Sequence, residues 1–177
     1  MNIKILDSWL REFLDTKATP KEIARKLSLT SVSVERTEPA RHASQPASQA
    51  ERGGQGAGVA GGKMGDDYIY DIEVTTNRPD LMSIQGIARE AAAVLPEQGI
   101  SAKFIEPKLP QVFNAEISFP LEIQNDPKLV NRIMAVVIEV EIGQSTVEIK
   151  DRLEKSGIRS LNNLIDVTNY VMREIGH

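Results

Sequence analysis

The densest group of polar side chains lies near the C-terminal end, in the sequence Asn162-Asn163-Leu-Ile-Asp166-Val-Thr168-Asn169. Amides and a hydroxyl near the start of a helix can bind a small polar ligand through hydrogen bonds, and the helix terminus favours negative charge. The alternative is structural: Asn163 caps the helix, Asp166 stands at its third position, and Thr168 packs against neighbouring residues. The residue types leave both interpretations open.

A second polar group is the tetrapeptide Asn77-Arg78-Pro79-Asp80. Its guanidinium and amide could bind an anion or contact a partner protein. In the structural alternative, Asn77 and Asp80 serve the turn and cap the following helix, while Arg78 is solvated or forms a local ion pair. Spacing alone favours the structural alternative.

Neither group is a catalytic arrangement. The chain has no cysteine, and its two histidines, His42 and His177, lack a neighbouring carboxylate or serine pattern. Spacing typical of metal ligands is also absent, so we expect no catalytic residue, no metal site and no cofactor bound by this chain. The net charge of −4 gives no overall basic field for nucleic acid.

The elements that position these groups follow from hydrophobic periodicity. Alternation over Tyr68–Thr75 predicts a half-buried strand, and Pro79 breaks it. We expect Asp80 to cap a helix that ends near Leu95, because apolar residues recur at positions 84, 87, 88, 91, 94 and 95.

Two short helices and a strand are expected before residue 40. Asp7 or Ser8 can cap a helix that buries Trp9, Leu10, Phe13 and Leu14. A capping box at Thr19-Pro-Lys-Glu22 begins the second helix. Alternation over Ser31–Glu35 predicts a strand.

The C-terminal part is expected to form two strands and two helices. Strands are predicted over Phe119–Gln124 and Asn131–Glu141, the second buried in part on both faces. A helix capped at Ser145-Thr146 runs to Lys155, with Gly157 in a left-handed conformation after it. A final helix is predicted to carry apolar residues and Thr168 on one face: Leu164, Thr168, Val171, Met172 and Ile175. Because nothing covers that face, we expect an unfinished domain.

Residues 40–65 differ in composition, with seven of the twelve glycines and one branched aliphatic residue, Val59. Such a segment buries too little apolar surface to offset its ordering entropy, which predicts a flexible linker. A phosphate-binding loop is disfavoured because no strand precedes the glycines and no Lys-Ser/Thr pair follows.

Three motifs in order resemble one family: Trp9-Leu-Arg-Glu-Phe13, Val74-Thr-Thr-Asn-Arg-Pro-Asp80 with Gly86-Ile-Ala-Arg-Glu90, and Gly157-Ile-Arg-Ser-Leu-Asn-Asn-Leu-Ile-Asp-Val-Thr-Asn-Tyr-Val171. The chain is similar to the bacterial phenylalanyl-tRNA synthetase β subunit. The motifs are long and specific, and the resemblance covers most of the chain outside residues 40–65.

The resemblance implies an α+β fold. Residues 1–39 and 66–102 would form a small, helical, winged-helix-like N-terminal domain, and residues 110–177 the incomplete start of an α/β editing domain. An oligonucleotide-binding barrel is usually inserted where this chain has residues 40–65, so the tRNA contact of that barrel is in doubt.

The same resemblance implies partners and a role. The β subunit pairs with a catalytic α subunit in an (αβ)₂ heterotetramer that charges phenylalanine tRNA, with ATP and Mg²⁺ serving the whole enzyme. The family's editing domain hydrolyses mischarged tyrosyl-tRNA, which makes Thr168 and Asn169 the first editing-pocket candidates and Asn163 a third. We expect this chain alone to be inactive, without a membrane segment, and cytoplasmic.

Two alternatives remain at this point. The chain could be a stand-alone winged-helix-like module that binds protein or nucleic acid, although its acidic balance disfavours nucleic acid. It could also be a free-standing editing hydrolase. That role requires a closed pocket, which the uncovered face of the final helix argues against.

Overall fold

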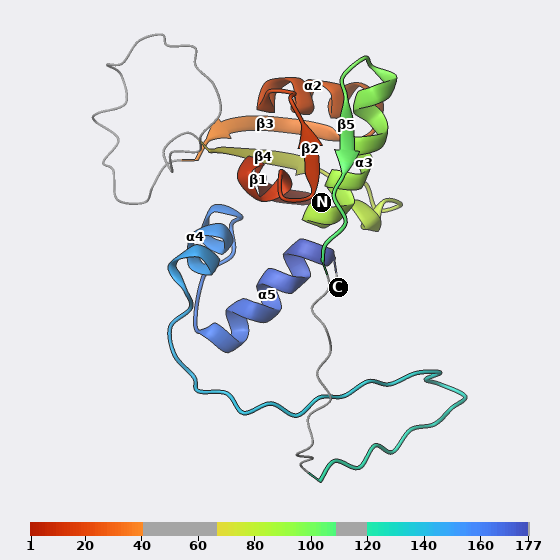
Figure 1. Cartoon of the computed structure of the whole chain (residues 1–177), viewed down its shortest axis with the longest axis vertical. Helices are drawn as coiled ribbons and strands as arrows, with labels where there is room; N and C mark the ends of the chain where they lie inside the picture. The colour runs from red at the N-terminus through yellow and green to blue at the C-terminus, as the bar shows by residue number, and fades with distance from the viewer. Residues whose placement is uncertain (41–66, 109–119, 177) are drawn as a thin grey trace.

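A computed structural model describes residues 1–40, 67–108 and 120–176. The fold is α+β, as the sequence predicts (Figure 1). Residues 41–66, which make up nearly all of the predicted linker, lie outside the described residues, as do Phe119 and both histidines. Ala40 is described: it is buried, and its N–H donates to the carbonyl of Asp67 at 2.6 Å.

A three-stranded antiparallel sheet forms the centre of the N-terminal part. Its order is β1 (Asn2–Leu6), β4 (Tyr68–Glu73) and β3 (Ser33–Pro39). Strand β4 confirms the predicted strand, whereas β3 begins later than predicted and carries a bulge between Val34 and Arg36. Since Pro39 pairs with Tyr68, the chain leaves and rejoins the sheet at one end of the β3–β4 pair.

Short elements at the chain start hold the core together. Helix α1 (Asp7–Leu10) follows β1 directly, and β2 (Leu14–Thr16) pairs with β5 (Ala102–Phe104). Trp9, Leu10, Phe13 and Leu14 are all buried, as predicted. The expected cap was wrong: Leu6 is the N-cap residue and makes no side-chain bond, because the carboxylate of Asp7 instead receives hydrogen bonds from Arg11 and Tyr70.

Helix α2 (Pro20–Thr30) confirms the capping box. The Thr19 hydroxyl accepts from the N–H of Glu22, and the Glu22 carboxylate accepts from the N–H of Thr19. These bonds, with that from the Thr19 hydroxyl to the Glu22 carboxylate, hold the pKa of Glu22 below its usual value. Ile23, Ala24 and Leu27 face the core.

Helix α3 (Ile84–Glu97) buries the predicted face, including Ile84, Ile87, Ala88, Ala91 and Leu95. Its predicted cap at Asp80 was wrong. Pro79–Leu81 form a separate short 3₁₀ turn, η2, and the Ser83 hydroxyl accepts from the N–H of Gly86 to start the helix. In the view of Figure 1, α2 lies above β3, and the C-terminal helices lie below the sheet.

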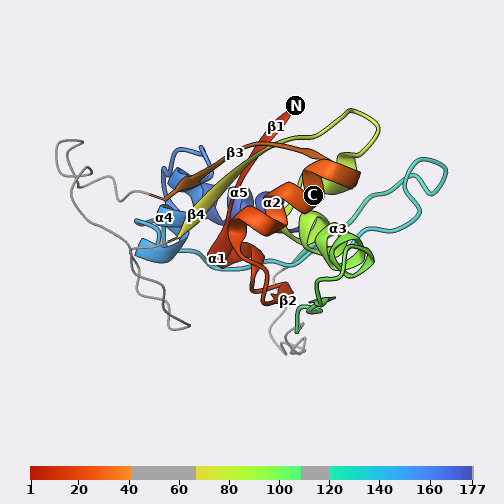
Figure 2. The same cartoon turned by 90° about the horizontal axis from the view of Figure 1, so that it is seen from above.

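The C-terminal part contains α4 (Val147–Lys155) and α5 (Asn163–Ile175). Thr146 caps α4, and Gly157 has the predicted left-handed conformation, with φ 79°. The two predicted strands were wrong for the described part, since residues 120–146 contain no strand. Strands need partners for their backbone hydrogen bonds, and among the described residues no sheet lies beside this segment (Figure 2).

Candidate functional site at the start of helix α5

The start of α5 is built by asparagine side chains. Asn162 is the N-cap residue, and its amide oxygen accepts from the N–H of Ile165 at 3.0 Å. The cap predicted from the sequence, Asn163, was therefore wrong by one residue. Asn162 satisfies one of the N–H groups left open at a helix start.

Asn163 connects α5 to the segment before α4. Its amide oxygen accepts from the N–H of Gly143 at 3.0 Å, and its amide nitrogen donates to the carbonyl of Glu141 at 2.8 Å. In addition, the N–H of Asn163 donates to the carbonyl of Gly143. Residues 141–143 are thus fixed to the helix start by a single side chain and its own backbone.

Asp166 is the most enclosed polar side chain of this region, with 0% exposure. Its carboxylate accepts from the hydroxyls of Ser145 at 2.5 Å and Ser160 at 2.6 Å, and from the N–H of Leu161 at 2.8 Å. Burial alone raises the pKa of Asp166, but these three donors together hold the pKa below its usual value. The carboxylate therefore joins the loops on both sides of α4 to α5.

The two main editing candidates lie further along the helix. Thr168 is exposed, and its hydroxyl donates to the carbonyl of Ile165 at 2.7 Å, while Asn169 is half-buried. With about 100° of rotation per residue, Asn163, Thr168 and Asn169 point in three different directions from the helix axis. The described residues place them on one helix without gathering their side chains at one point.

Arg152 connects this region to the N-terminal core, a role that no sequence pattern predicted. Its guanidinium lies 5.3 Å from the Trp9 ring centroid and 5.9 Å from that of Tyr170. It pairs with Glu12 and with Glu148 and donates to the hydroxyl of Tyr170. Burial alone lowers the pKa of Arg152, but Glu12 and Tyr170 raise it above its usual value.

The Asn77–Asp80 turn lies between β4 and α3. Arg78 donates to Asp80 at 2.9 Å and to Glu90 at 2.8 Å, and its side chain is 34% exposed. The hydrogen bonds that Arg78 donates to Asp80, and then those to Glu90, raise the pKa of Arg78 above its usual value. Glu90 also accepts from the hydroxyl of Ser31. Arg78 therefore ties the turn to α3, while a role in contacting a partner stays a prediction.

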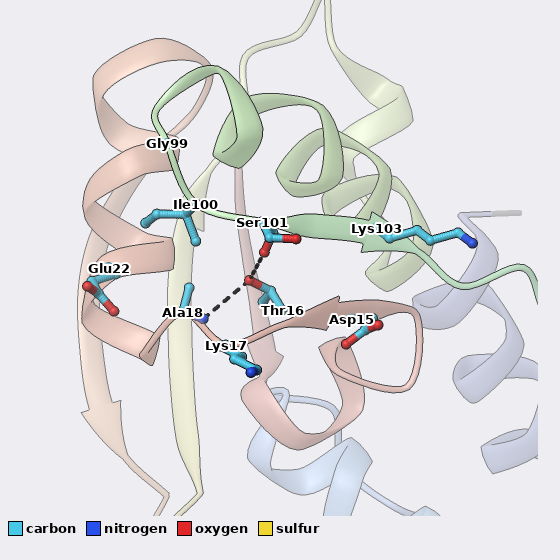
Figure 3. A pocket seen from close by; sticks show the side chains of 9 residues that line it. All are labelled: Asp15, Thr16, Lys17, Ala18, Glu22, Gly99, Ile100, Ser101 and Lys103. Atoms are coloured by element: carbon cyan, nitrogen blue, oxygen red, sulfur yellow. Dashed lines mark hydrogen bonds between the residues drawn. The ribbon is translucent and has the colours of Figure 1, made fainter.

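A shallow pocket of about 600 Å³ lies away from both groups (Figure 3). The close view shows Thr16 donating to the carbonyl of Ser101 at 2.7 Å and accepting from the N–H of Ala18 at 3.2 Å. Two lysines and two carboxylates surround these groups: Asp15, Lys17, Glu22 and Lys103. None of the site residues predicted from the sequence lines this pocket.

Across the part of the chain that the structure describes, no three His, Asp or Glu side chains gather as a metal site would require. The same residues include no helix long and apolar enough to cross a membrane.

Comparison with known proteins finds a matching domain family and similar proteins for this chain. Residues 130–177, which contain α4 and α5, match the B3/4 domain family. A phenylalanine–tRNA ligase beta subunit of Carboxydothermus hydrogenoformans is 44% identical over 112 residues, which are 63% of this chain. The chain is a relative of the bacterial phenylalanine–tRNA ligase beta subunits. Those of Clostridium tetani and Thermotoga maritima are 41% and 38% identical over 114 and 117 residues.

The phenylalanine–tRNA ligase beta subunits are much longer than this chain. The matched residues make up 13% of the Carboxydothermus protein and 14% of each of the other two. The comparisons confirm the resemblance drawn from the three motifs. They leave the individual roles of Thr168, Asn169, Asn163, Asn77 and Arg78 as predictions.

Proposed function

We propose that this chain is part of a phenylalanine–tRNA ligase β subunit, which works with a catalytic α subunit to charge tRNA with phenylalanine. The observation that carries the proposal is the 44% identity over 112 residues to one such subunit. The B3/4 domain match over residues 130–177 also supports it. ATP and Mg²⁺ serve the whole enzyme, and no step through them is assigned to this chain.

The proposal includes a division of the chain into domains. Residues 1–39 and 66–102 form the N-terminal domain, residues 40–65 link its halves, and residues 110–177 begin the editing domain. The pairing of β3 with β4 supports the discontinuous N-terminal domain, because it joins the two halves in one sheet. A winged-helix-like architecture is supported by the packing of α2 and α3 beside a small antiparallel sheet.

Within this function, the α5 region contributes to the editing of mischarged tyrosyl-tRNA. A second site that hydrogen-bonds the hydroxyl of tyrosine can reject it far more strongly than an apolar synthetic pocket can. Thr168 is exposed and its hydroxyl can still accept a hydrogen bond, while the half-buried Asn169 carries an amide, so both supply groups for such recognition. Asn163 supports them by holding residues 141–143 against the helix start. The chain alone is proposed to be inactive in charging and editing.

A graft into a related enzyme tests the proposal. The corresponding N-terminal residues of the Carboxydothermus β subunit are replaced by this chain, and the product is expressed with the Carboxydothermus α subunit. We expect a complex that charges phenylalanine tRNA. The matched control carries the corresponding residues of the Clostridium tetani subunit, which shows whether the enzyme tolerates a graft from another relative.

The same graft separates the editing role from the rest. Thr168→Val removes the hydroxyl while keeping the side-chain shape, so we expect slower hydrolysis of tyrosyl-tRNA with unchanged phenylalanine charging. Hydrolysis at the parent rate would refute the role of Thr168 and leave the family assignment intact. A graft that fails to assemble, while the Clostridium control assembles, would refute the proposed function itself.

A further inference from the structure

Helix α5 packs with one face against the rest of the chain, and Thr168 lies on the opposite face. Buried or half-buried positions recur at the helical period along the packed face: 163, 166, 169, 170, 173 and 174. At about 100° per residue, Thr168 lies about 160° around the helix axis from Tyr170, whereas Asn169 lies about 100° from it. Thr168 therefore points away from the packed face, and Asn169 lies at its margin.

The packed face is held at two places, one on each side of the two main editing candidates. The first is Asp166, whose carboxylate accepts hydrogen bonds from the loops on both sides of α4. The second is Trp9 of the N-terminal part, which stacks on Tyr170 with ring centroids 4.4 Å apart and donates its indole N–H to Glu174 at 3.1 Å. Tyr170 and Glu174 are one helical turn apart, so a single indole contacts two successive turns of the same face.

Trp9 is a firm support for this contact. Its side chain is fully buried and belongs to the hydrophobic core of the N-terminal part. The guanidinium of Arg152 lies 5.3 Å from its ring centroid and 5.9 Å from that of Tyr170, so α4 contacts the same aromatic pair. A closely packed ring has little room to change its rotamer. The position of Trp9 therefore constrains the second half of α5.

We propose that Trp9 is a positioning residue for editing, because its contacts with Tyr170 and Glu174 hold α5 with Thr168 turned toward the bound tyrosyl group. This inference rests on the proposed function, in which Thr168 and Asn169 belong to the editing pocket. It adds a dependence of editing on a side chain of the N-terminal domain. Trp9 lies in the hydrophobic core, so it acts through α5 and not on the substrate itself.

The first measurement uses the full chain, which has no cysteine of its own. Thr168→Cys and Asn169→Cys each introduce one thiol, and their rates of reaction with a thiol reagent are compared. We expect the thiol at position 168 to react faster, since Thr168 is exposed and Asn169 is half-buried. Adding Trp9→Leu should lower the ratio of the two rates roughly threefold or more, because a loosened α5 exposes both positions.

Tyr170→Leu repeats this measurement from the other side of the contact. Tyr170 is partly buried and packs against the core without belonging to it, so its substitution leaves the core intact. We expect the same fall in the ratio of labelling rates. A ratio that stays at the parental value in both variants would overturn the inference.

The second measurement uses the grafted enzyme. Trp9→Leu should lower kcat/KM for the hydrolysis of tyrosyl-tRNA roughly tenfold, because small displacements of a positioned group are costly, while phenylalanine charging keeps the parental rate. Trp9→Phe keeps an aromatic ring against Tyr170 and should recover most of the loss. Combined with Thr168→Val, Trp9→Leu should slow hydrolysis no further than Thr168→Val alone, since both act through one hydroxyl.

The matched control is Leu27→Ala, which removes buried side-chain volume from α2 and keeps both contacts between Trp9 and α5. We expect it to leave hydrolysis at the parental rate once circular dichroism shows a folded protein. Parental hydrolysis by a Trp9→Leu graft that still charges, or an equal loss in the Leu27→Ala graft, would overturn the inference. A parent graft that does not charge would refute the proposed function instead, and the labelling ratio of the full chain then decides whether Trp9 orients α5.

Discussion

Trp9 and Tyr170 stack on each other, with ring centroids 4.4 Å apart and an interplanar angle of 31°. They are far apart in sequence, one in α1 and the other in α5. Trp9 is fully buried, and its indole N–H donates to Glu174 at 3.1 Å. The aromatic pair therefore couples the C-terminal helices to the hydrophobic core of the N-terminal part.

Arg152 should contribute measurably to this coupling. Arg152→Met keeps the side-chain length but removes the ion pairs with Glu12 and Glu148 and the bond to Tyr170. We expect the free energy of unfolding to fall by about 1–3 kcal/mol. Because Trp9 is the only tryptophan, its fluorescence should report the change directly in denaturant titrations.

Arg159 offers a control for that variant. It is exposed, so Arg159→Met removes the same charge from the same region without touching the aromatic pair. We expect its fluorescence and stability to match those of the parent chain. Equal effects of the two variants would mean that Arg152 acts only through the net charge.

Gly86 is a position where even a methyl group cannot be accommodated. A Cβ there would lie 1.8 Å from the carbonyl oxygen of Asp80, which belongs to the backbone. Gly86→Ala should therefore lower the free energy of unfolding by about 3 kcal/mol or more, because η2 and α3 must separate.

Gly143→Ala is the matched control for Gly86→Ala. A Cβ at Gly143 meets nothing within 4 Å, and the substitution keeps the N–H that donates to Asn163. We expect a change within about 1 kcal/mol in urea-induced unfolding. Comparable losses for both variants would contradict the close approach of Asp80 to α3.

One substitution distinguishes whether Arg78 only stabilises the fold or also contacts a partner protein. Arg78→Met breaks the pairs with Asp80 and Glu90, which are partly exposed to solvent. We expect a loss of about 1 kcal/mol in thermal unfolding of the isolated chain. If Arg78 also contacts the α subunit, the variant graft should bind the α subunit much more weakly than this small loss of stability explains. A loss of binding free energy no larger than the loss of stability would support the structural role alone.

Asp166 should make stability depend on pH in the acid range. Its pKa is lower in the folded chain than the ordinary value of 3.8, so its charged form favours folding. This contribution is complete above the ordinary value and is lost as the pH falls through the lower folded value.

The comparison of Asp166→Asn with the parent chain isolates that contribution. We expect the variant to melt at a lower temperature at neutral pH, and the difference to shrink on acidification below about pH 4. Other carboxylates with lowered pKa values, including Glu22 and Glu90, affect both proteins alike. Melting curves that keep a constant separation at every pH would contradict the role of the Asp166 charge.

Local chemistry made several elements predictable from sequence. The capping box at Thr19 and the left-handed Gly157 depend only on residues within one or two helical turns, so the local sequence is enough to predict them. The apolar face of α3 was equally clear, because buried positions recur at the helical period. The start of α3 was predicted at the wrong residue. Aspartate and serine are both common N-cap residues, so the sequence pattern alone does not distinguish Asp80 from Ser83.

Non-local contacts explain the elements that sequence reasoning missed. Strand β1 exists because Asn2–Leu6 pairs with β4, more than sixty residues later. Conversely, residues 131–141 have the composition of a strand but no partner strand among the described residues. The role of Arg152 likewise depends on Trp9 and Tyr170 meeting in space. Composition at one position reveals none of these pairings.

The most direct test of the account is the rate at which the Carboxydothermus enzyme carrying this chain charges phenylalanine tRNA. We predict that the grafted β subunit assembles with the α subunit and charges at a rate close to that of the Clostridium tetani graft. A folded graft that neither assembles nor charges, beside an active control graft, would contradict the assignment of this chain to a phenylalanine–tRNA ligase.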